Sequence, residues 1–324
     1  MRSISGRLRP VRRCVLLLAF ILVGAAFNSQ TPPTERNAIL ISWDGALREH
    51  VRADLARGRL PNLAKLVRGG ALVDLDVTGH QTDTKSGHAQ MLTGYDPALT
   101  GVYSNGKFKP IPSGYSIFER LHQAFGKHGL TTTMLTGKDH NLGSSPPGLL
   151  GQGEPYFLVR PGITVWDGDQ MRPASVVGEK AVNYIRAFAN PGRFFLFIHF
   201  ADIDLGGHRA GEDSEAYGNA LAECDRWLGR ILTELETQGI DGRTLVYVSA
   251  DHGFELGSKN HGNAPHIFLA TSDSSVSQAG QQRDIAPTIL QAMGVDLGKI
   301  NPALPGKPLG LATGRTGSAR HQAR

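Results

Sequence analysis

The sequence lacks an apolar run long enough to cross a membrane, which needs roughly 20 residues. Its longest run, Cys14 to Val23, reaches only about 14 residues when it is extended to Phe27. Five arginines precede the run, and Gly24-Ala25-Ala26 follow it. This order is typical of a cleaved secretory signal. We therefore predict a signal peptide over residues 1–26, export to the periplasm or the medium, and no stable membrane insertion after cleavage. An uncleaved anchor is the alternative.

Cysteine is equally scarce, with two residues in a chain of 324. Cys14 lies in the predicted signal peptide and would leave with it. Cys224 would then be alone, which excludes an intrachain disulfide in the mature protein. Because Cys224 falls on the apolar stripe of a predicted helix, we expect a buried and inert thiol.

The mature chain also lacks an excess of charge of either sign. The full sequence has 34 Lys and Arg against 29 Asp and Glu, a formal net charge of +5. Residues 1–26 hold five of the arginines and no acid, so the remainder carries 29 residues of each sign. This balance predicts no nucleic acid as a partner.

What is present is an alternation of short apolar runs with amphipathic stretches. The runs predict strands, most of them buried on both faces, at 38–43, 71–77, 131–135, 194–200, 244–250 and 267–270. The amphipathic stretches predict helices at 47–68, 117–128, 174–189, 214–237 and 285–293. The pattern indicates a three-layer α/β fold, with a doubly wound, mostly parallel central sheet and helices on both faces. We place this domain at residues 38–305, after a linker at 27–37 and before a disordered tail at 306–324.

Acidic residues stand just after three of these predicted strands. Asp44 follows the first strand, Asp202 and Asp204 follow the fourth, and Asp251 follows the fifth. Ligands of open α/β sheets bind at the carboxyl ends of strands, so these carboxylates should meet at one edge. Such like charges repel one another unless a divalent cation relieves them. One Asp alone could be a helix cap or a turn former, so only the combination of these residues indicates a cation site.

Histidines accompany the carboxylates. His208 lies four residues after Asp204 across a predicted glycine turn, His252 adjoins Asp251, and His261 follows nine residues later. Mixed Asp and His ligands suit zinc or manganese better than calcium, which prefers oxygen ligands. We predict two divalent metal ions, zinc before manganese, because one catalytic zinc needs fewer than the six ligands available: Asp44, Asp204, His208, Asp251, His252 and His261. His266 is the rival to His261 as the last ligand.

Three further segments resemble a known family. Pro61-Asn62-Leu63-Ala64-Lys65-Leu66, Leu92-Thr93-Gly94-Tyr95-Asp96-Pro97 and Asp284-Ile285-Ala286-Pro287-Thr288-Ile289-Leu290 are similar to the alkaline phosphatase superfamily. The resemblance is closest to its type I phosphodiesterase/nucleotide pyrophosphatase and sulfatase-like branches, and it extends from about Ile39 to Asp296. It implies the alkaline phosphatase-like form of the α/β fold and the hydrolysis of phosphate esters.

The resemblance also implies a nucleophile. Counting back from Leu92-Thr93-Gly94 places the family's nucleophile at Thr84, which should also bind a metal. Thr84 would begin a helix that continues through His88 and Met91, and a helix N-terminus favours an anion. Thr82 and Ser86 remain alternatives, and a Thr here could also be an ordinary helix cap.

Three substrate contacts follow from the same resemblance. Asn105 looks like the asparagine that holds a phosphoryl oxygen in the diesterase branch, where an amide donor stabilises transition-state charge. Lys138 and His140 look like the Gly-Lys-x-His of sulfatases, in which Lys and His contact the sulfuryl group. Sulfatases need Cys or Ser in the place of Thr84 and usually have Asn in the place of His252, and both differences favour two metals and phosphate. Lys85-Ser86-Gly87 replaces the Phe-Pro-Asn of the diesterase branch, which leaves nucleotide specificity open.

We therefore expect an enzyme that hydrolyses a small-molecule phosphodiester or phosphomonoester through a covalent phospho-threonine. A sulfatase-like or phosphonate ester hydrolase is the alternative within the superfamily. A metal-binding pseudoenzyme is the alternative of another class. The sequence names neither the substrate nor the oligomeric state.

Overall fold

The computed structural model describes residues 35–142, 162–168, 171–189 and 192–310. The predicted signal peptide, and the part of the predicted tail beyond residue 310, lie outside the described residues. Among the residues that are described, no helix combines the length and the apolarity that a membrane span requires.

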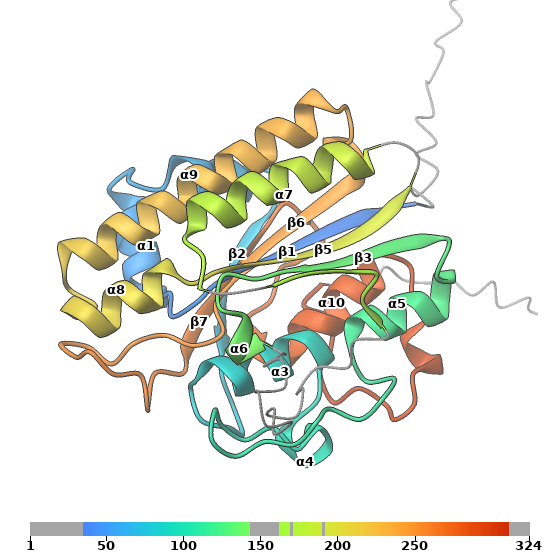
Figure 1. The fold of residues 1–324 in the computed structure, drawn as a ribbon, viewed down its shortest axis with the longest axis horizontal. Coiled ribbons are helices and arrows are strands. Elements are labelled where there is room, and N and C mark those ends of the chain that lie inside the picture. Colours follow the sequence, from blue (N-terminus) through green and yellow to red (C-terminus); the bar gives the residue numbers. More distant parts are fainter. Residues whose placement is uncertain (1–34, 143–161, 169–170, 190–191, 311–324) are drawn as a thin grey trace, which may run out of the picture. The chain divides into compact units, whose positions relative to one another are not determined.

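The described residues form an eight-stranded sheet (Figure 1), in the order β4-β3-β5-β1-β6-β7-β2-β8. Of these strands, β7 runs antiparallel to its neighbours β6 and β2, and the other pairs are parallel. The six predicted strands are all present, and the mostly parallel sheet is confirmed. The strands are β1 (Asn37–Trp43), β2 (Ala71–Asp76), β3 (Leu130–Leu135), β4 (Val165–Asp167), β5 (Arg193–Phe200), β6 (Thr244–Ser249), β7 (His266–Thr271) and β8 (Gly280–Gln281).

Helices cover both faces of the sheet, which confirms the three-layer α/β fold. One layer contains α1 (Arg48–Ala56), α2 (Pro61–Arg68), α7 (Ala174–Phe188), α8 (Asp202–Ala210) and α9 (Glu215–Thr237). The opposite layer contains α3 (Thr84–Thr93), α5 (Ile117–Phe125), α6 (Asp139–Leu142) and α10 (Ile285–Ala292), with the short α4 (Pro97–Thr100) beyond them. Cys224 is fully buried in α9, as its position on the apolar stripe predicts.

The prediction of one helix over residues 47–68 is wrong. The chain forms α1 and α2 instead, with a break between them. Gly58 adopts a positive φ of 72°, which ends the first helix, and Pro61 begins the second. Proline lacks the N–H that a helix interior needs, but it suits the first helical position.

The predicted end of the domain, residue 305, is too early, because the domain continues to residue 310. The Lys307 N–H donates to Asp284 Oδ1 at 2.7 Å, and the Leu309 N–H donates to Thr288 Oγ1 at 3.0 Å. Gly310 forms a bridge with Val276. Leu309 is also buried and packs against the core of the domain. Together these contacts hold residues 306–310 on the domain.

The three strands β5, β1 and β6 lie side by side in the middle of the sheet. Trp43 pairs with Phe200, and Ser42 pairs with Ser249, so the three strands end at the same level. Their buried apolar side chains anchor this part of the sheet in the core. The chain that leaves each strand end therefore starts from one edge, where Asp44, Asp204 and Asp251 follow.

Candidate metal centre

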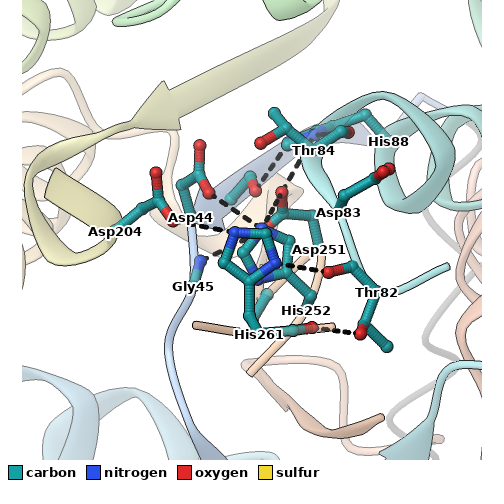
Figure 2. A network of polar contacts seen from close by, with 12 residues as sticks. Asp44, Gly45, Thr82, Asp83, Thr84, His88, Asp204, Asp251, His252 and His261 are labelled. Atoms are coloured by element: carbon teal, nitrogen blue, oxygen red, sulfur yellow. Dashed lines mark hydrogen bonds and ion pairs between the residues drawn. The ribbon is translucent and has the colours of Figure 1, made fainter. Parts of the chain in front are cut away.

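The structure brings the six predicted metal ligands together at this edge (Figure 2 shows five of them). Asp44, Asp251 and His252 are fully buried, and Asp204 is nearly so. His208 lies at the rim with 45% of its side chain exposed, while His261 is 15% exposed. The three carboxylates and His252 are thus buried, while His261 is partly exposed and His208 lies at the surface.

The three imidazoles of the cluster are oriented by backbone carbonyls. The Nδ1 atoms of His208, His252 and His261 lie 2.8, 2.9 and 2.6 Å from the carbonyl oxygens of Lys259, Gly253 and Thr82. A carbonyl oxygen only accepts, so each Nδ1 carries the proton and donates it. Each Nε2 is therefore left as the atom that can bind a metal ion.

The three carboxylates each have one oxygen with a protein donor and one without. Asp44 Oδ1, Asp204 Oδ1 and Asp251 Oδ2 are buried and have no hydrogen-bond partner among the described residues. These oxygens lie 3.3–3.4 Å from imidazole Nε2 atoms, Asp44 and Asp251 from His252, and Asp204 from His208. Buried polar atoms without partners are costly, and a cation between them would remove that cost.

The possible ligands fall into two groups that share Asp204. In one group the ligand atoms of Asp204, His208 and His261 lie within 4.8 Å of one another, and in the other those of Asp44, Asp204 and His252 do. The His208 and His261 Nε2 atoms face each other at 3.0 Å. Two electron-rich nitrogens at that distance need a shared proton or a shared metal ion. This group therefore fits one transition metal, and the group that contains His252 offers ligands for a second.

The electrostatics of the cluster also indicate a cation site. Burial raises the pKa of Asp251 well above its ordinary value, and the charge of Asp44 adds to this effect. Burial would lower the pKa of His252, but the charges of Asp251 and Asp44 outweigh it and raise the pKa to about 10. Burial and the charge of His252 lower the pKa of His261 to about 4. Asp251 and His252 thus both bind a proton more tightly than they ordinarily would, while the neighbouring imidazole of His261 stays neutral.

The Asp44-Gly45 pair has a local structural reason. Gly45 has a positive φ of 73°, and a Cβ atom there would lie 2.7 Å from the Phe254 ring. The Gly45 N–H donates to Asp251 Oδ1 at 3.1 Å. Glycine therefore lets the chain turn directly after Asp44 and connect two of the carboxylates.

The prediction of a glycine turn between Asp204 and His208 is wrong. Both residues lie in helix α8, where residues four apart face the same side. Gly207 is still required, because a Cβ atom there would lie 2.5 Å from the Phe254 ring. The helix therefore presents an acid and an imidazole on one face, as the turn was expected to do.

Thr84 is the first residue of α3, next to this cluster. Asp83 is the N-cap and accepts from the Ser86 N–H, so Thr84 is not the cap. The two alternative hydroxyls have protein acceptors: Thr82 donates to the His261 carbonyl, and Ser86 donates to the Gln81 carbonyl at 2.7 Å. Within the described residues, the Thr84 hydroxyl makes no hydrogen bond of this kind.

Asn105 lies beside the start of α3. Its Oδ1 accepts from the Lys85 N–H at 2.8 Å, and its own N–H donates to Asp83 Oδ2 at 2.7 Å. The first contact fixes the side chain of Asn105 against the start of α3, and the second fixes its backbone against the N-cap. Because Oδ1 is occupied, the Nδ2 group is what Asn105 could offer to a phosphoryl oxygen near Thr84.

The other two predicted substrate contacts lie in different surroundings. Lys138 is buried, and its ammonium contacts the carboxylates of Asp44 and Asp204. His140 is exposed on α6. The structure therefore joins Lys138 to the metal-ligand carboxylates and leaves His140 on the surface.

Two buried histidines of this site were missed by the sequence argument. His199 on β5 donates from Nε2 to Asp44 Oδ2 at 2.9 Å. His88, one helical turn after Thr84, donates from Nδ1 to the Thr84 carbonyl at 2.7 Å and accepts at Nε2 from Ser42 at 2.8 Å. A single imidazole within the apolar run before Asp202, and another four residues after Thr84, were the available signals.

Solved structures share this fold. The phosphonate monoester hydrolase of Agrobacterium radiobacter aligns with a TM-score of 0.60 and 15% identity, over 85% of this chain and 76% of that one. The fold, together with the family match below, is that of the alkaline phosphatase superfamily.

Within that superfamily, the profile of type I phosphodiesterase / nucleotide pyrophosphatase matches residues 38–302. The chain belongs to this family. A pyrophosphatase/phosphodiesterase from Schizosaccharomyces pombe is 25% identical over 76% of this chain and 50% of its own length. A bis(5'-adenosyl)-triphosphatase from Mus musculus is 22% identical over 74% of this chain and 52% of its own length. The chain thus spans about half the length of these curated relatives.

Proposed function

We propose that this protein hydrolyses phosphate esters with two bound divalent metal ions and Thr84 as the nucleophile. The observation that carries the proposal is the orientation of three imidazoles. Their Nδ1 atoms donate to carbonyls, and their Nε2 atoms face carboxylate oxygens that have no donor. This arrangement beside the start of α3 suits metal-assisted transfer of a phosphoryl group.

The ligands divide between two ions, with zinc before manganese. Asp44, Thr84, Asp251 and His252 would hold one ion, and Asp204, His208 and His261 would hold the other. When bound, the pair supplies positive charge for the attacking and the leaving oxygen. His266 is a poor ligand candidate, because its side chain is 53% exposed and its Nδ1 contacts Asp76 Oδ1 at 2.9 Å at the start of β7.

Thr84 would perform the covalent step. Its Oγ gives its proton to water and attacks phosphorus, the bond from phosphorus to the leaving alkoxide breaks, and the alkoxide takes a proton from water. A second water then attacks the phospho-threonine, returns a proton to the Thr84 oxygen, and releases phosphate from a monoester substrate or a phosphate monoester from a diester substrate. The N-terminus of α3 favours the negative charge that builds up beside Thr84.

Asn105 and His140 are the proposed substrate contacts. The Nδ2 group of Asn105 would donate to a phosphoryl oxygen, because its Oδ1 is held by Lys85. His140 would meet the substrate from the exposed side of α6. We also propose export after cleavage at residue 26, which N-terminal sequencing of the periplasmic or secreted protein would test.

A panel of nitrophenyl esters tests the function. The metal-free protein should be inactive, and zinc or manganese should restore hydrolysis of the phosphate monoester or diester, with close to two metal ions per chain. Preference for the phosphonate ester would keep the mechanism but change the substrate. Activity on the sulfate ester alone with a single calcium ion would overturn the proposal, and inactivity on all four esters would favour a pseudoenzyme.

A further inference from the structure

Lys138 is a buried cation between two acidic ligands that come from different elements. It follows β3 in the turn Thr136-Gly137-Lys138 and is 4% exposed. Its Nζ lies 3.0 Å from Asp44 Oδ2, after β1, and 2.5 Å from Asp204 Oδ2, on α8. One ammonium therefore links the carboxylates that belong to the two metal groups.

The contacts of Lys138 leave the other oxygen of each carboxylate available. Asp44 Oδ1 lies 3.4 Å from His252 Nε2, and Asp204 Oδ1 lies 3.3 Å from His208 Nε2. Neither Oδ1 atom has a hydrogen-bond donor among the described residues. In each carboxylate, Oδ2 thus contacts the ammonium and Oδ1 faces an imidazole.

The turn that carries Lys138 is itself fixed. The Gly137 N–H donates to His199 Nδ1 at 3.3 Å, so His199 must carry its proton on Nε2, where it donates to Asp44 Oδ2. Arg172 Nε donates to the Thr136 carbonyl at 3.0 Å. Asp44 Oδ2 therefore receives two donors, and both depend on this one turn.

We propose that Lys138 is a positioning residue that clamps Asp44 and Asp204 by their Oδ2 atoms and reserves the two Oδ1 atoms for metal ions. This inference rests on the proposed two-metal function, and it replaces the substrate contact that the sulfatase resemblance implies for Lys138. An ammonium with two carboxylate partners and almost no exposed surface is poorly placed to bind a substrate anion. Its charge instead offsets the repulsion between two buried acids.

The clamp has a consequence for metal binding. Lys138 and a metal ion both neutralise Asp44 and Asp204, so the charge of Lys138 matters most when no metal is bound. Because the ammonium and the metal ions offset the same negative charge, we expect a variant that lacks the ammonium to bind zinc more tightly than the wild type, provided that it folds. A substrate contact would leave zinc binding unchanged and would raise KM instead.

The test uses Lys138→Met, which keeps the length of the side chain but removes its charge. Lys65→Met is the matched control, because Lys65 forms a 2.6 Å ion pair with Glu236 on the exposed surface. Thermal midpoints are measured with chelator and with saturating zinc. With chelator, the thermal midpoint of Lys138→Met should be lower than that of the wild type. With saturating zinc, the difference between the two midpoints should be smaller. The KM of the variant should stay within about threefold of the wild-type value.

A second variant keeps the test decisive if Lys138→Met fails to fold without metal. Asp204→Asn removes one of the two repelling charges, so the loss of Lys138 should cost less in that background. No coupling between the two substitutions in chelated protein, or a tenfold rise in KM with unchanged midpoints, would overturn the clamp. These midpoints need no substrate, so a failed ester panel would count against the proposed function and not against this measurement.

Discussion

At the scale of single residues, what distinguishes Thr84 is the surroundings of its hydroxyl. Thr82 and Ser86 have equivalent hydroxyls within two positions, but both donate to backbone carbonyls. A hydroxyl held in that way must first give up its acceptor before it can attack phosphorus. The Thr84 hydroxyl donates to no backbone carbonyl among the described residues, and Thr84 lies at the first position of α3.

Replacement of Thr84 tests the covalent route. We expect Thr84→Ala to lower turnover by several orders of magnitude, because the attacking oxygen is gone. Thr84→Ser should keep substantial activity, since its hydroxyl survives. Acid quenching during turnover should trap phosphate on the peptide that contains Thr84. Near-normal turnover by Thr84→Ala would instead indicate direct attack by water.

The last metal ligand is a second question at this scale. His261→Ala should remove one metal ion per chain and most of the activity, because its Nε2 faces that of His208 at 3.0 Å. His266→Ala is the control and should keep both ions, since His266 pairs with Asp76 of β2 at the start of β7. Elemental analysis of the two purified variants decides the matter, and the reverse pattern would transfer the role to His266.

At the scale of elements, helix α3 connects the nucleophile to the metal ligands through close packing. A Cβ atom on Gly87 would lie 2.3 Å from the Asp251 carbonyl oxygen and 2.9 Å from the Asp251 Cβ. Glycine at this position therefore sets how closely α3 approaches the chain after β6. The same contact places Thr84, one turn earlier, beside Asp251 and His252.

Gly87→Ala should force α3 away from Asp251. We expect a loss of about 1–3 kcal/mol in the free energy of unfolding, as for other overpacked sites, together with a large fall in activity. Gly218→Ala in α9 is the matched control, since its Cβ would meet only the Arg59 side chain at 3.9 Å. That variant should gain about 0.5–1 kcal/mol, because alanine favours a helix interior. Urea unfolding measures both, and an undamaged Gly87→Ala would refute the packing argument.

At the scale of the whole molecule, the buried acids control the pH dependence of metal binding because their charges raise the pKa of His252. His252 has a pKa raised to about 10, above its ordinary value near 6.5, so it is protonated throughout the neutral range. In the metal-free protein, the stability from this proton is complete below about pH 6.5 and is lost as pH rises through about 10. A metal ion on Nε2 must displace that proton.

Zinc binding should therefore release protons and become tighter as pH rises from about 6 to about 9. Calorimetry at pH 7.5 in two buffers with different ionisation heats should show release of at least about one proton per chain. His266→Ala should behave like the wild type, because its imidazole lies outside the cluster. Affinity that is independent of pH, with no proton release, would exclude His252 as a protonated ligand.

Much of the fold could be predicted from sequence because it depends on local patterns. Apolar runs of strand length and the stripe of α9 located the central strands and the long helix with errors of one or two residues. The break between α1 and α2 was missed although Gly58 and Pro61 mark it in the sequence. Strands β4 and β8 are only three and two residues long, too short to show any period.

The residues that could form the site can be recognised from local sequence, since Asp44, Asp204, Asp251 and their histidines follow strands whose ends must meet at one edge of a parallel sheet. The contacts of each side chain depend instead on how distant segments pack. The roles of His199, His88 and Lys138 depend on partners 46 to 155 residues away in the chain, and no local pattern records such a distance. By sequence, Lys138 could be a solvated loop residue after β3. It contacts two carboxylates because the sheet order places β3 beside β5, next to β1.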